Sequence, residues 1–451
     1  MTTTPSAEPD APSPIEPQTL IRRTRWGVIW LLTLTLFSAL TVGGLLAPIQ
    51  EAAKADLGLS DQQLALLVGT ATAIPVSLLA LPIAWLVDHR PRARLLVLLA
   101  SFWAIGTIGT AFVQDFLGLF AARFIAGLGA GTAFPVLISI LADVCLPERR
   151  GRTMVLVSMG AWAGAAAAFA IGGTLFGYLE ANPLPVFPNM DAWRATHLVV
   201  GIGAALLVLP LFLIREPPRY EVEQTSIAIG PTARAFWRRR GFLGPLFVGN
   251  FAGGLAEGAA ALWIGSVLVR QYGQTPGQFG GWVGLVILLS GIFGSLIGGF
   301  SADAGQKLRL RGGILVPAVI ATAISIPASA YPVMPTVLGF ALVLFVLLVG
   351  GTIVNLVNTA AIAVLIPNEE RAVSLAGLKL VSVVVGGPVT GAIIYFMTGY
   401  MDGPDGLGRI LTWLGVVTGF ISLGGYWLAM RNAPQPVAKV QADDLIAESV
   451  G

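Results

Sequence analysis

The chain has 451 residues, of which 55% are hydrophobic and only 11% are charged, and its formal net charge is +3. Soluble globular proteins carry roughly 25% charged residues, so this composition favours a chain that lies in a lipid bilayer. The single cysteine, Cys145, excludes an internal disulfide bond and argues against a metal site made of cysteines. The small positive excess indicates membrane topology and not nucleic-acid binding.

Twelve apolar segments follow one another along the chain, each near the length of about 20 residues that a membrane-spanning helix needs. Residues 1–21, before the first segment, are rich in Pro, Ser and Thr and lack the apolar run of a signal peptide. We expect a disordered cytoplasmic tail there, and a second tail over 431–451. The predicted spans are 26–48, 62–87, 94–113, 117–145, 153–178 and 195–214 in the first half, and 242–269, 279–301, 313–331, 336–366, 372–397 and 410–430 in the second.

A polar, arginine-rich stretch over 215–241 joins the two sets of six segments. Most of the 27 Lys and Arg residues lie in this stretch, in the tails and in alternate short loops. Positive charge gathers in cytoplasmic loops, so we expect both termini in the cytoplasm. The order predicts an all-α membrane protein with two six-helix bundles, 22–214 and 242–430, arranged as parallel repeats about an axis along the membrane normal.

Charged residues mark corresponding loops of the two halves. The loop after the second segment contains Asp88, Arg92 and Arg94, and Asp303 follows the eighth segment. A carboxylate at a helix end can accept hydrogen bonds from a neighbouring helix N-terminus and can pair with arginine. We expect these four residues to form a latch that steadies one arrangement of the halves.

The fourth segment begins with an arginine followed by a glycine-rich run. Arg123 lies inside the predicted span and precedes Gly127, Gly129 and Gly131. The glycines predict close approach of another helix. An arginine within the bilayer is a candidate functional residue, although its side chain can also extend to the outer interface.

These loops and the arginine-led fourth segment resemble the major facilitator superfamily over nearly the whole chain. Shorter stretches at 215–219, 258–263 and 41–50 are similar to the spinster-type branch, whose members move lysolipids and sphingolipids. The resemblance implies a secondary transporter that works by alternating access, with an amphipathic, lipid-like substrate bound between the two halves.

The chain departs from the spinster-type pattern at carboxylates of that branch. Spinster-type proteins carry an Asp–Arg pair in the first helix, where this chain has Ser38 and Ala39. They carry a Glu in the fourth helix, where this chain has Ala130. If those carboxylates carry protons in the relatives, this chain cannot do so at the same places, and both coupling and substrate stay open.

Glu257 and Lys379 are ionisable residues inside the predicted spans of the second half. Charge in the middle of the bilayer costs on the order of 3 kcal/mol, so such a residue should face a cavity or a partner. We expect both side chains to face the central cavity, with Glu257 carrying a proton and Lys379 holding an anionic headgroup or pairing with Glu257. A purely structural ion pair between helices is the alternative.

Three amides and one aromatic residue complete the candidate site. Asn250 lies seven residues before Glu257 and therefore on the same helical face, and Asn355 and Asn358 also share a face. These amides could bind substrate or join helices. Trp263 is a candidate lining residue, with packing or lipid contact as the alternative.

Other classes of protein receive little support from the sequence. No Gly-x-x-x-x-Gly-Lys-Ser/Thr loop or catalytic Ser, His and Asp pattern is present, and two histidines do not make a histidine-rich metal site. We expect no enzyme activity, cofactor or metal; the expected partners are membrane lipids, a small-molecule or lipid substrate, and protons as the candidate coupling ion. A small organic anion or hydrophobic drug is the alternative substrate, and a lipid scramblase or non-transporting receptor the alternative class. Short loops and abundant Ala and Gly fit a bacterial inner membrane.

Overall fold

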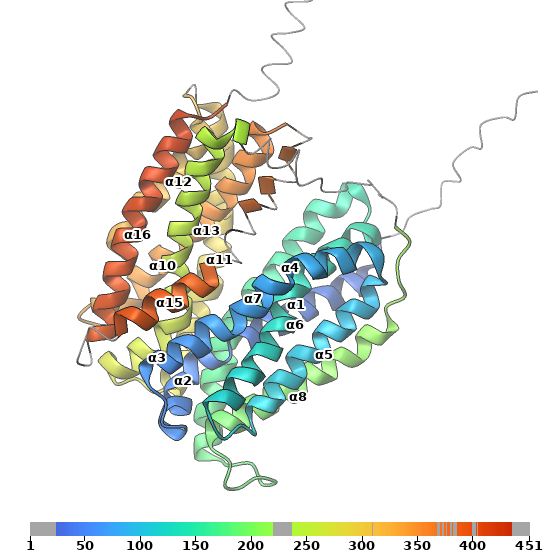
Figure 1. Cartoon of the computed structure of the whole chain (residues 1–451), viewed down its shortest axis with the longest axis vertical. Helices are drawn as coiled ribbons and strands as arrows, with labels where there is room; N and C mark the ends of the chain where they lie inside the picture. Colours follow the sequence, from blue (N-terminus) through green and yellow to red (C-terminus); the bar gives the residue numbers. More distant parts are fainter. Residues whose placement is uncertain are drawn as a thin grey trace, which may run out of the picture.

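The computed structural model of the chain describes residues 24–219, 237–308, 310–367, 386–398 and 405–434, with a few single residues between 370 and 403. All regular structure in these ranges is helical, and the helices form two bundles that lie side by side (Figure 1). Eleven of the described helical segments are long and apolar enough to cross a membrane. The predicted all-helical fold is confirmed, and the span expected at 372–397 is described in part, with its second half forming the helix that begins at Gly386.

The first bundle contains α1 (Trp26–Gly44), α2 (Leu46–Asp56), α3 (Asp61–Ala65), the π-helical turn η1 (Leu66–Thr70), α4 (Ala71–His89), α5 (Arg92–Thr110), α6 (Phe116–Val144), α7 (Arg150–Ala181), α8 (Ala192–Val208) and η3 (Leu209–Leu213). The second contains α10 (Arg240–Tyr272), α11 (Pro276–Lys307), η4 (Gly313–Leu315), α12 (Val316–Ala328), η5 (Tyr331–Val333), α13 (Val337–Leu365), α15 (Gly386–Thr398) and α16 (Gly406–Arg431).

The first membrane-spanning segment is interrupted at Leu45, where α1 ends and α2 begins. Pro48 lies at the start of α2 and has no backbone N–H to donate to the carbonyl of Gly44. Its ring also crowds that carbonyl, so a change of helix direction one turn before the proline is expected. The sequence alone predicts one continuous helix here, because the whole stretch is apolar.

Three apolar cores show how the bundles meet. We call the end of the molecule at which α1 begins and α16 ends the terminal face, and the other end the opposite face (Figure 1). One core belongs to the first bundle alone and includes Ile29 and Leu137, and another belongs to the second bundle alone and includes Leu246 and Val357. The third core joins both bundles towards the opposite face. The bundles are therefore packed together towards one end of the molecule.

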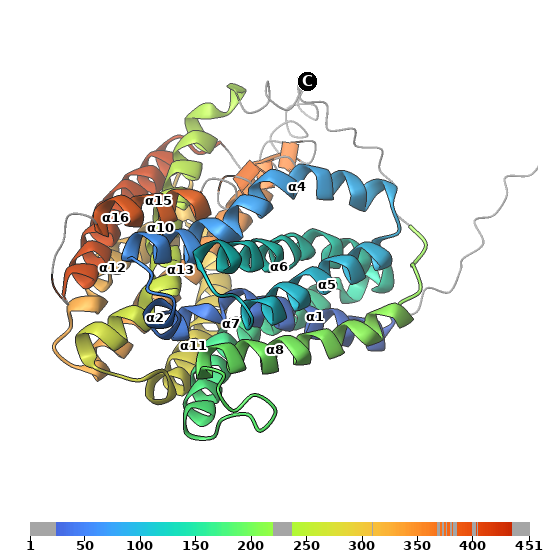
Figure 2. The same ribbon diagram turned by 60° about the horizontal axis from the view of Figure 1, so that its bottom comes forward.

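Helices α7 and α11 come into backbone contact within this joint region, and both views show them adjacent (Figures 1 and 2). A Cβ atom added to Gly173 would lie 2.4 Å from the carbonyl oxygen of Pro276 and 2.7 Å from Cα of Gly280. No side chain fits in that space. In lipid, such close approach of small residues supplies much of the attraction between helices.

The close approach predicted for the glycines of the fourth segment is confirmed within the first bundle. A Cβ atom at Gly127 would lie 2.7 Å from Cα of Thr72 in α4, and one at Gly129 would lie 2.2 Å from the Leu99 carbonyl oxygen in α5. Helix α6 therefore packs tightly against both neighbours.

We expect Gly173→Leu to separate the bundles at the α7–α11 contact, since the new side chain has no space. Overpacking costs about 1–3 kcal/mol, so the thermal unfolding temperature of the purified protein should fall by several degrees. Gly203→Leu in α8 is the matched control, because no atom lies within 4 Å of its added Cβ. Equal unfolding temperatures for both variants would contradict the assigned contact.

Candidate functional site

A cavity of about 300 Å³ lies between the two bundles. Its volume is at the lower end of the range found for small-molecule sites, about 300–1,000 Å³. The first bundle contributes η1 and α4 to the wall, and the second contributes α10 and α15. The lining residues are Val68, Gly69, Thr72, Ala73, Asn250, Phe251, Gly254, Gly258, Ala261, Leu262 and Thr390.

The wall of this cavity is mostly apolar. Three described lining residues carry polar side chains, namely Thr72, Asn250 and Thr390, and none of the described lining residues is ionisable. Val68 and Gly69 belong to the π-helical turn η1, a kind of turn that often occurs at functional sites. Such a wall can hold an apolar molecule and orient it with a few hydrogen bonds.

Asn250 is held in place by a hydrogen bond from another predicted residue. Asn358 is fully buried, and its Nδ2 donates to Oδ1 of Asn250 at 2.9 Å and to the hydroxyl oxygen of Tyr426 at 2.9 Å. Asn355 is exposed and donates to the Gly351 carbonyl at 3.3 Å. The cavity wall therefore contains Asn250, while Asn358 joins three helices behind it.

Glu257 does not line the cavity between the bundles, contrary to our expectation from its spacing with Asn250. The wall that α10 contributes is centred on Gly254 and Gly258, and Glu257 turns to the side of it, into the second bundle. The carboxylate lies over Gly351, where an added Cβ would be 1.7 Å from its Oε1 atom. The glycine leaves room for it. Lys379, its predicted partner, lies outside the described residues.

Trp263 and Arg123 are both buried in the bundles and do not line the described cavity. Trp263 is 1% exposed and packs in the joint core. The Arg123 guanidinium is likewise buried and donates to the carbonyl oxygens of Gly43 at 2.8 Å and Val42 at 3.4 Å. It thus supplies donors and positive charge at the end of α1, where free carbonyls carry partial negative charge.

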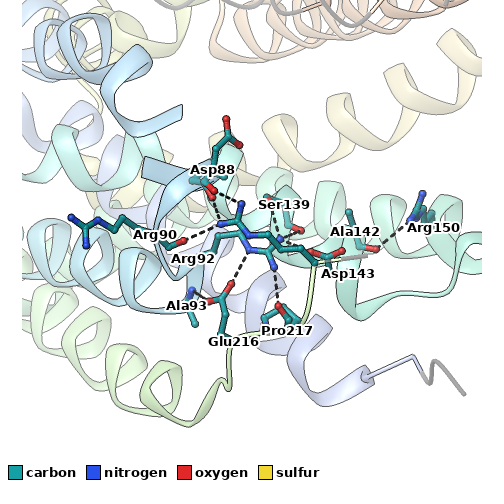
Figure 3. A network of polar contacts seen from close by, with 12 residues as sticks. Asp88, Arg90, Arg92, Ala93, Ser139, Ala142, Asp143, Arg150, Glu216 and Pro217 are labelled. Atoms are coloured by element: carbon teal, nitrogen blue, oxygen red, sulfur yellow. Dashed lines mark hydrogen bonds and ion pairs between the residues drawn. The ribbon is translucent and has the colours of Figure 1, made fainter. Parts of the chain in front are cut away.

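Of the four predicted latch residues, Arg92 makes the most contacts (Figure 3). It is 2% exposed, at the start of α5. Its guanidinium bonds the carboxylates of Asp143 and Glu216, both oxygens of Ser139 and the carbonyl oxygen of Pro217, with a distance of 2.9 Å to Glu216. All these partners lie in the first bundle or in the non-helical segment that follows it.

The other latch residues contribute little to this network. The backbone carbonyl of Asp88, and not its carboxylate, accepts a hydrogen bond from Arg219 (Figure 3). Arg94 and Asp303 are exposed and form no hydrogen bond or ion pair among the described residues. Glu216, which we did not predict, also accepts a hydrogen bond from the Ala93 backbone N–H at 2.8 Å. It closes the N-terminus of α5 as an anionic cap.

Glu370 forms a second ionic contact near the terminal face, within the second half of the chain. Its carboxylate pairs with Arg238 and with Arg239, the latter at 2.5 Å. Burial alone would raise the pKa of Glu370, but the hydrogen bonds and charges of Arg239 and Arg238 outweigh burial and hold the pKa below its ordinary value. The pair therefore stabilises the protein at neutral pH and is lost as the pH falls through that lowered pKa.

A cluster of charges at the opposite face joins the two bundles. Arg270 at the end of α10 contacts Glu51 of α2 at 2.8 Å and Asp61 of α3 at 2.5 Å, and Lys54 contacts Asp61 at 2.7 Å. Gln50 adds hydrogen bonds from α2 to α10. Sequence reasoning missed this cluster, although Lys54 and Arg270 lie outside the tails and loops in which most of the positive charge gathers.

We expect Arg270→Ala to loosen the bundles at the opposite face. Partly exposed ion pairs are worth about 0.2–1 kcal/mol each, and Arg270 makes two of them, so the population with separated ends should rise about twofold to thirtyfold. Electron–electron distance measurements between spin labels at Ala55→Cys and Gln274→Cys, in a Cys145→Ser background, would report the separation. Arg409→Ala is the control, because Arg409 is exposed and its one ion pair among the described residues is with Asp405 of its own half, at 4.0 Å. An unchanged distance distribution in Arg270→Ala would sink this role.

Arg92→Ala should destabilise the first bundle, because Glu216 and Asp143 lose a buried guanidinium. Breaking a buried ion pair costs about 3–5 kcal/mol. Arg94→Ala, two residues away on an exposed position, should change the stability by less than about 0.5 kcal/mol. Denaturant unfolding would give the free energy of unfolding of the two purified variants. Equal losses of stability would show that the Arg92 network stabilises the protein no more than the exposed Arg94 does.

Comparison with known proteins places this architecture in a family. The sequence matches the model of the Major Facilitator Superfamily over residues 31–387. Protein spinster homolog 1 of Homo sapiens is 25% identical over 258 residues, which is 53% of this chain and 46% of that protein. NiaP of Bacillus subtilis, named for niacin/nicotinamide transport, is 25% identical over 62% of this chain and 73% of its own length. The chain spans about half the length of the spinster homologues that it matches.

The fold is also similar to a solved structure. It matches a bacterial homologue of the human lysosomal transporter Spinster, in an inward-facing and unoccupied conformation, with a TM-score of 0.76 and 20% identity. The match covers 91% of this chain and 98% of that chain. The resemblance predicted from the loop and helix motifs is thereby confirmed. The chain belongs to the Major Facilitator Superfamily.

Proposed function

We propose that this protein is a secondary active transporter that moves an amphipathic, lipid-like molecule by alternating access. The observation that carries this proposal is the chemistry of the cavity between the bundles. Its described wall is apolar, with three polar side chains and no ionisable one. An apolar chain would be desolvated against this wall, and Asn250, Thr72 and Thr390 would hydrogen-bond a polar group.

The resemblance to the spinster-type branch implies the same substrate class. Spinster homologues are among the curated proteins that this chain resembles. The similarity to NiaP favours a second candidate, a small polar molecule such as an organic anion. A small anion would need a cationic side chain, and the described lining residues offer none. We therefore rank the amphipathic substrate first.

The arrangement of the bundles suggests the state that the structure represents. The joint core and the Arg270 cluster hold the opposite face together, whereas each bundle has its own core elsewhere. We propose that the terminal face is cytoplasmic, because Lys and Arg gather in its loops. The protein would then be in an inward-facing state in a cell inner membrane, with Asp88, Arg92, Arg94 and Asp303 contributing to the cytoplasmic latch in another state.

The proposal also includes the ion whose gradient drives transport. Protons are the candidate coupling ion that the sequence suggested, and no described lining residue of the cavity can carry one. A coupling group would therefore act from outside the cavity wall, and Glu257 is our candidate, with either a proton or Na⁺ as the cation that its carboxylate holds. In this proposal Arg123 and Trp263 have structural roles. Arg123 holds the end of α1, and Trp263 packs in the joint core.

Gly254→Leu should block transport without unfolding the protein. Gly254 lines the cavity, and no atom lies within 4 Å of its added Cβ, so the leucine fills substrate space. We expect uptake of a labelled lysolipid into proteoliposomes to fall by at least about tenfold, which corresponds to 1.4 kcal/mol of lost transition-state or binding free energy.

Gly244→Leu in the same helix is the matched control, because its added Cβ also meets no atom and Gly244 does not line the cavity. Parallel assays with small organic anions, each with and without a proton gradient, separate the substrate classes. Uptake of anions with no lysolipid uptake by the unaltered protein would overturn the proposed substrate. Gradient-independent lipid movement would favour a scramblase.

A further inference from the structure

A small second cavity lies inside the second bundle, apart from the cavity between the bundles. Its volume is about 30 Å³, and its wall comes from α10, α12, α13 and α16 together with the residue that follows α12. This volume suits one species of about the size of a water molecule. Glu257 is the only ionisable residue among those that line it.

The Glu257 carboxylate has no partner of its own among the described residues. It forms neither a hydrogen bond nor an ion pair with any described donor, and its oxygen atoms are seated in the space that Gly351 leaves. An ionised carboxylate that is withdrawn from water costs several kcal/mol unless a counter-charge or donors compensate it. Something else must therefore compensate this group when it is ionised.

Three of the four hydroxyl groups around it do not compensate, because each donates its hydrogen to a backbone carbonyl. The hydroxyl of Ser325 donates to the Ala321 carbonyl at 2.9 Å, that of Ser329 donates to the Ser325 carbonyl at 3.0 Å, and that of Ser422 donates to the Gly249 carbonyl at 2.8 Å. Each hydroxyl therefore leaves only oxygen lone pairs for the cavity. Thr322 adds a fourth hydroxyl to the wall.

A cavity with a carboxylate and several hydroxyl oxygens has the composition of a site for a hard cation, which takes oxygen ligands. We propose that this cavity binds one monovalent cation, Na⁺, on Glu257 and the surrounding hydroxyl oxygens. One carboxylate balances one positive charge, and the described residues contain no group of three acidic, His or Cys side chains that could hold a divalent metal. A single proton would occupy one oxygen and would leave the other acceptors facing each other.

The site joins four helices of the second bundle, so the cation would act as a structural tie between them. Helix α10 also forms part of the cavity between the bundles and carries Arg270 at its end. Helix α10 thus connects the Glu257 site to the cavity between the bundles and to Arg270. Binding itself does not depend on which substrate the protein carries.

The test is the thermal unfolding temperature of the purified full chain at neutral pH, in NaCl, KCl or choline chloride at matched ionic strength. A ligand that binds the folded state alone stabilises it with the logarithm of its concentration above Kd. We expect the unfolding temperature of the unaltered protein to rise in this way with Na⁺ and to respond much less to K⁺ or choline.

Glu257→Gln should abolish the Na⁺-dependent rise, and Ser325→Ala, which keeps the charge, should shift the rise to several-fold higher Na⁺ concentrations. Asp303→Asn removes an exposed carboxylate elsewhere and should retain the full response. A response that persists in Glu257→Gln, or that is equal for Na⁺ and choline, would overturn the proposal. So would stabilisation by acid alone with no effect of Na⁺. Lysolipid uptake is measured separately in proteoliposomes, so loss of the Na⁺ site and loss of the proposed transport function are distinguished.

Discussion

The contact of α7 with α11 is the constraint on which the arrangement of the two halves depends. Lipid removes the hydrophobic attraction that would hold two apolar helices together in water, so attraction must come from close packing and polar bonds. Glycines supply the closeness at Gly173 and Gly280, and again at Gly265, where an added Cβ would lie 2.4 Å from the Ala47 carbonyl oxygen. The apolar core shared by the two halves surrounds these contacts.

Charge is placed in three distinct ways relative to that contact. Arg92 and its carboxylates stay within the first half and tie a helix start to the departing chain. Arg270 and its carboxylates bridge the halves at the opposite face, where the proposed change of state would have to break them. Glu257 forms no ion pair with any described residue of the second half. The position of a charged residue relative to the two bundles, more than its type, thus decides whether its charge stabilises one bundle or joins both.

This division separates the proposed substrate cavity from the proposed ion site. In the proposed motion of the halves, the cavity between them would change its walls, because η1 and α4 come from one half and α10 and α15 from the other. The described walls of the small cavity around Glu257 come from one half alone, so the same motion would not separate them. Helix α10 lines both, so it is the element through which occupancy of one could influence the other, and coupling of this kind requires two arrangements of a shared element.

The sequence by itself determined the number and order of the apolar segments, the pairing of two similar halves and the superfamily, because these follow from long hydrophobic runs and short local motifs. It also located the close-packed glycines of α6.

The sequence could not place side chains around a helix relative to a cavity. The seven-residue spacing of Asn250 and Glu257 predicts that both face the cavity between the bundles. The part of α10 in the cavity wall is centred on Gly254 and Gly258, so Asn250 lines this cavity and Glu257 faces the second bundle instead. Nor could it pair Arg270 with Glu51 and Asp61, since residues about 210–220 positions apart meet only when the two bundles pack together. Tertiary packing alone decides such contacts.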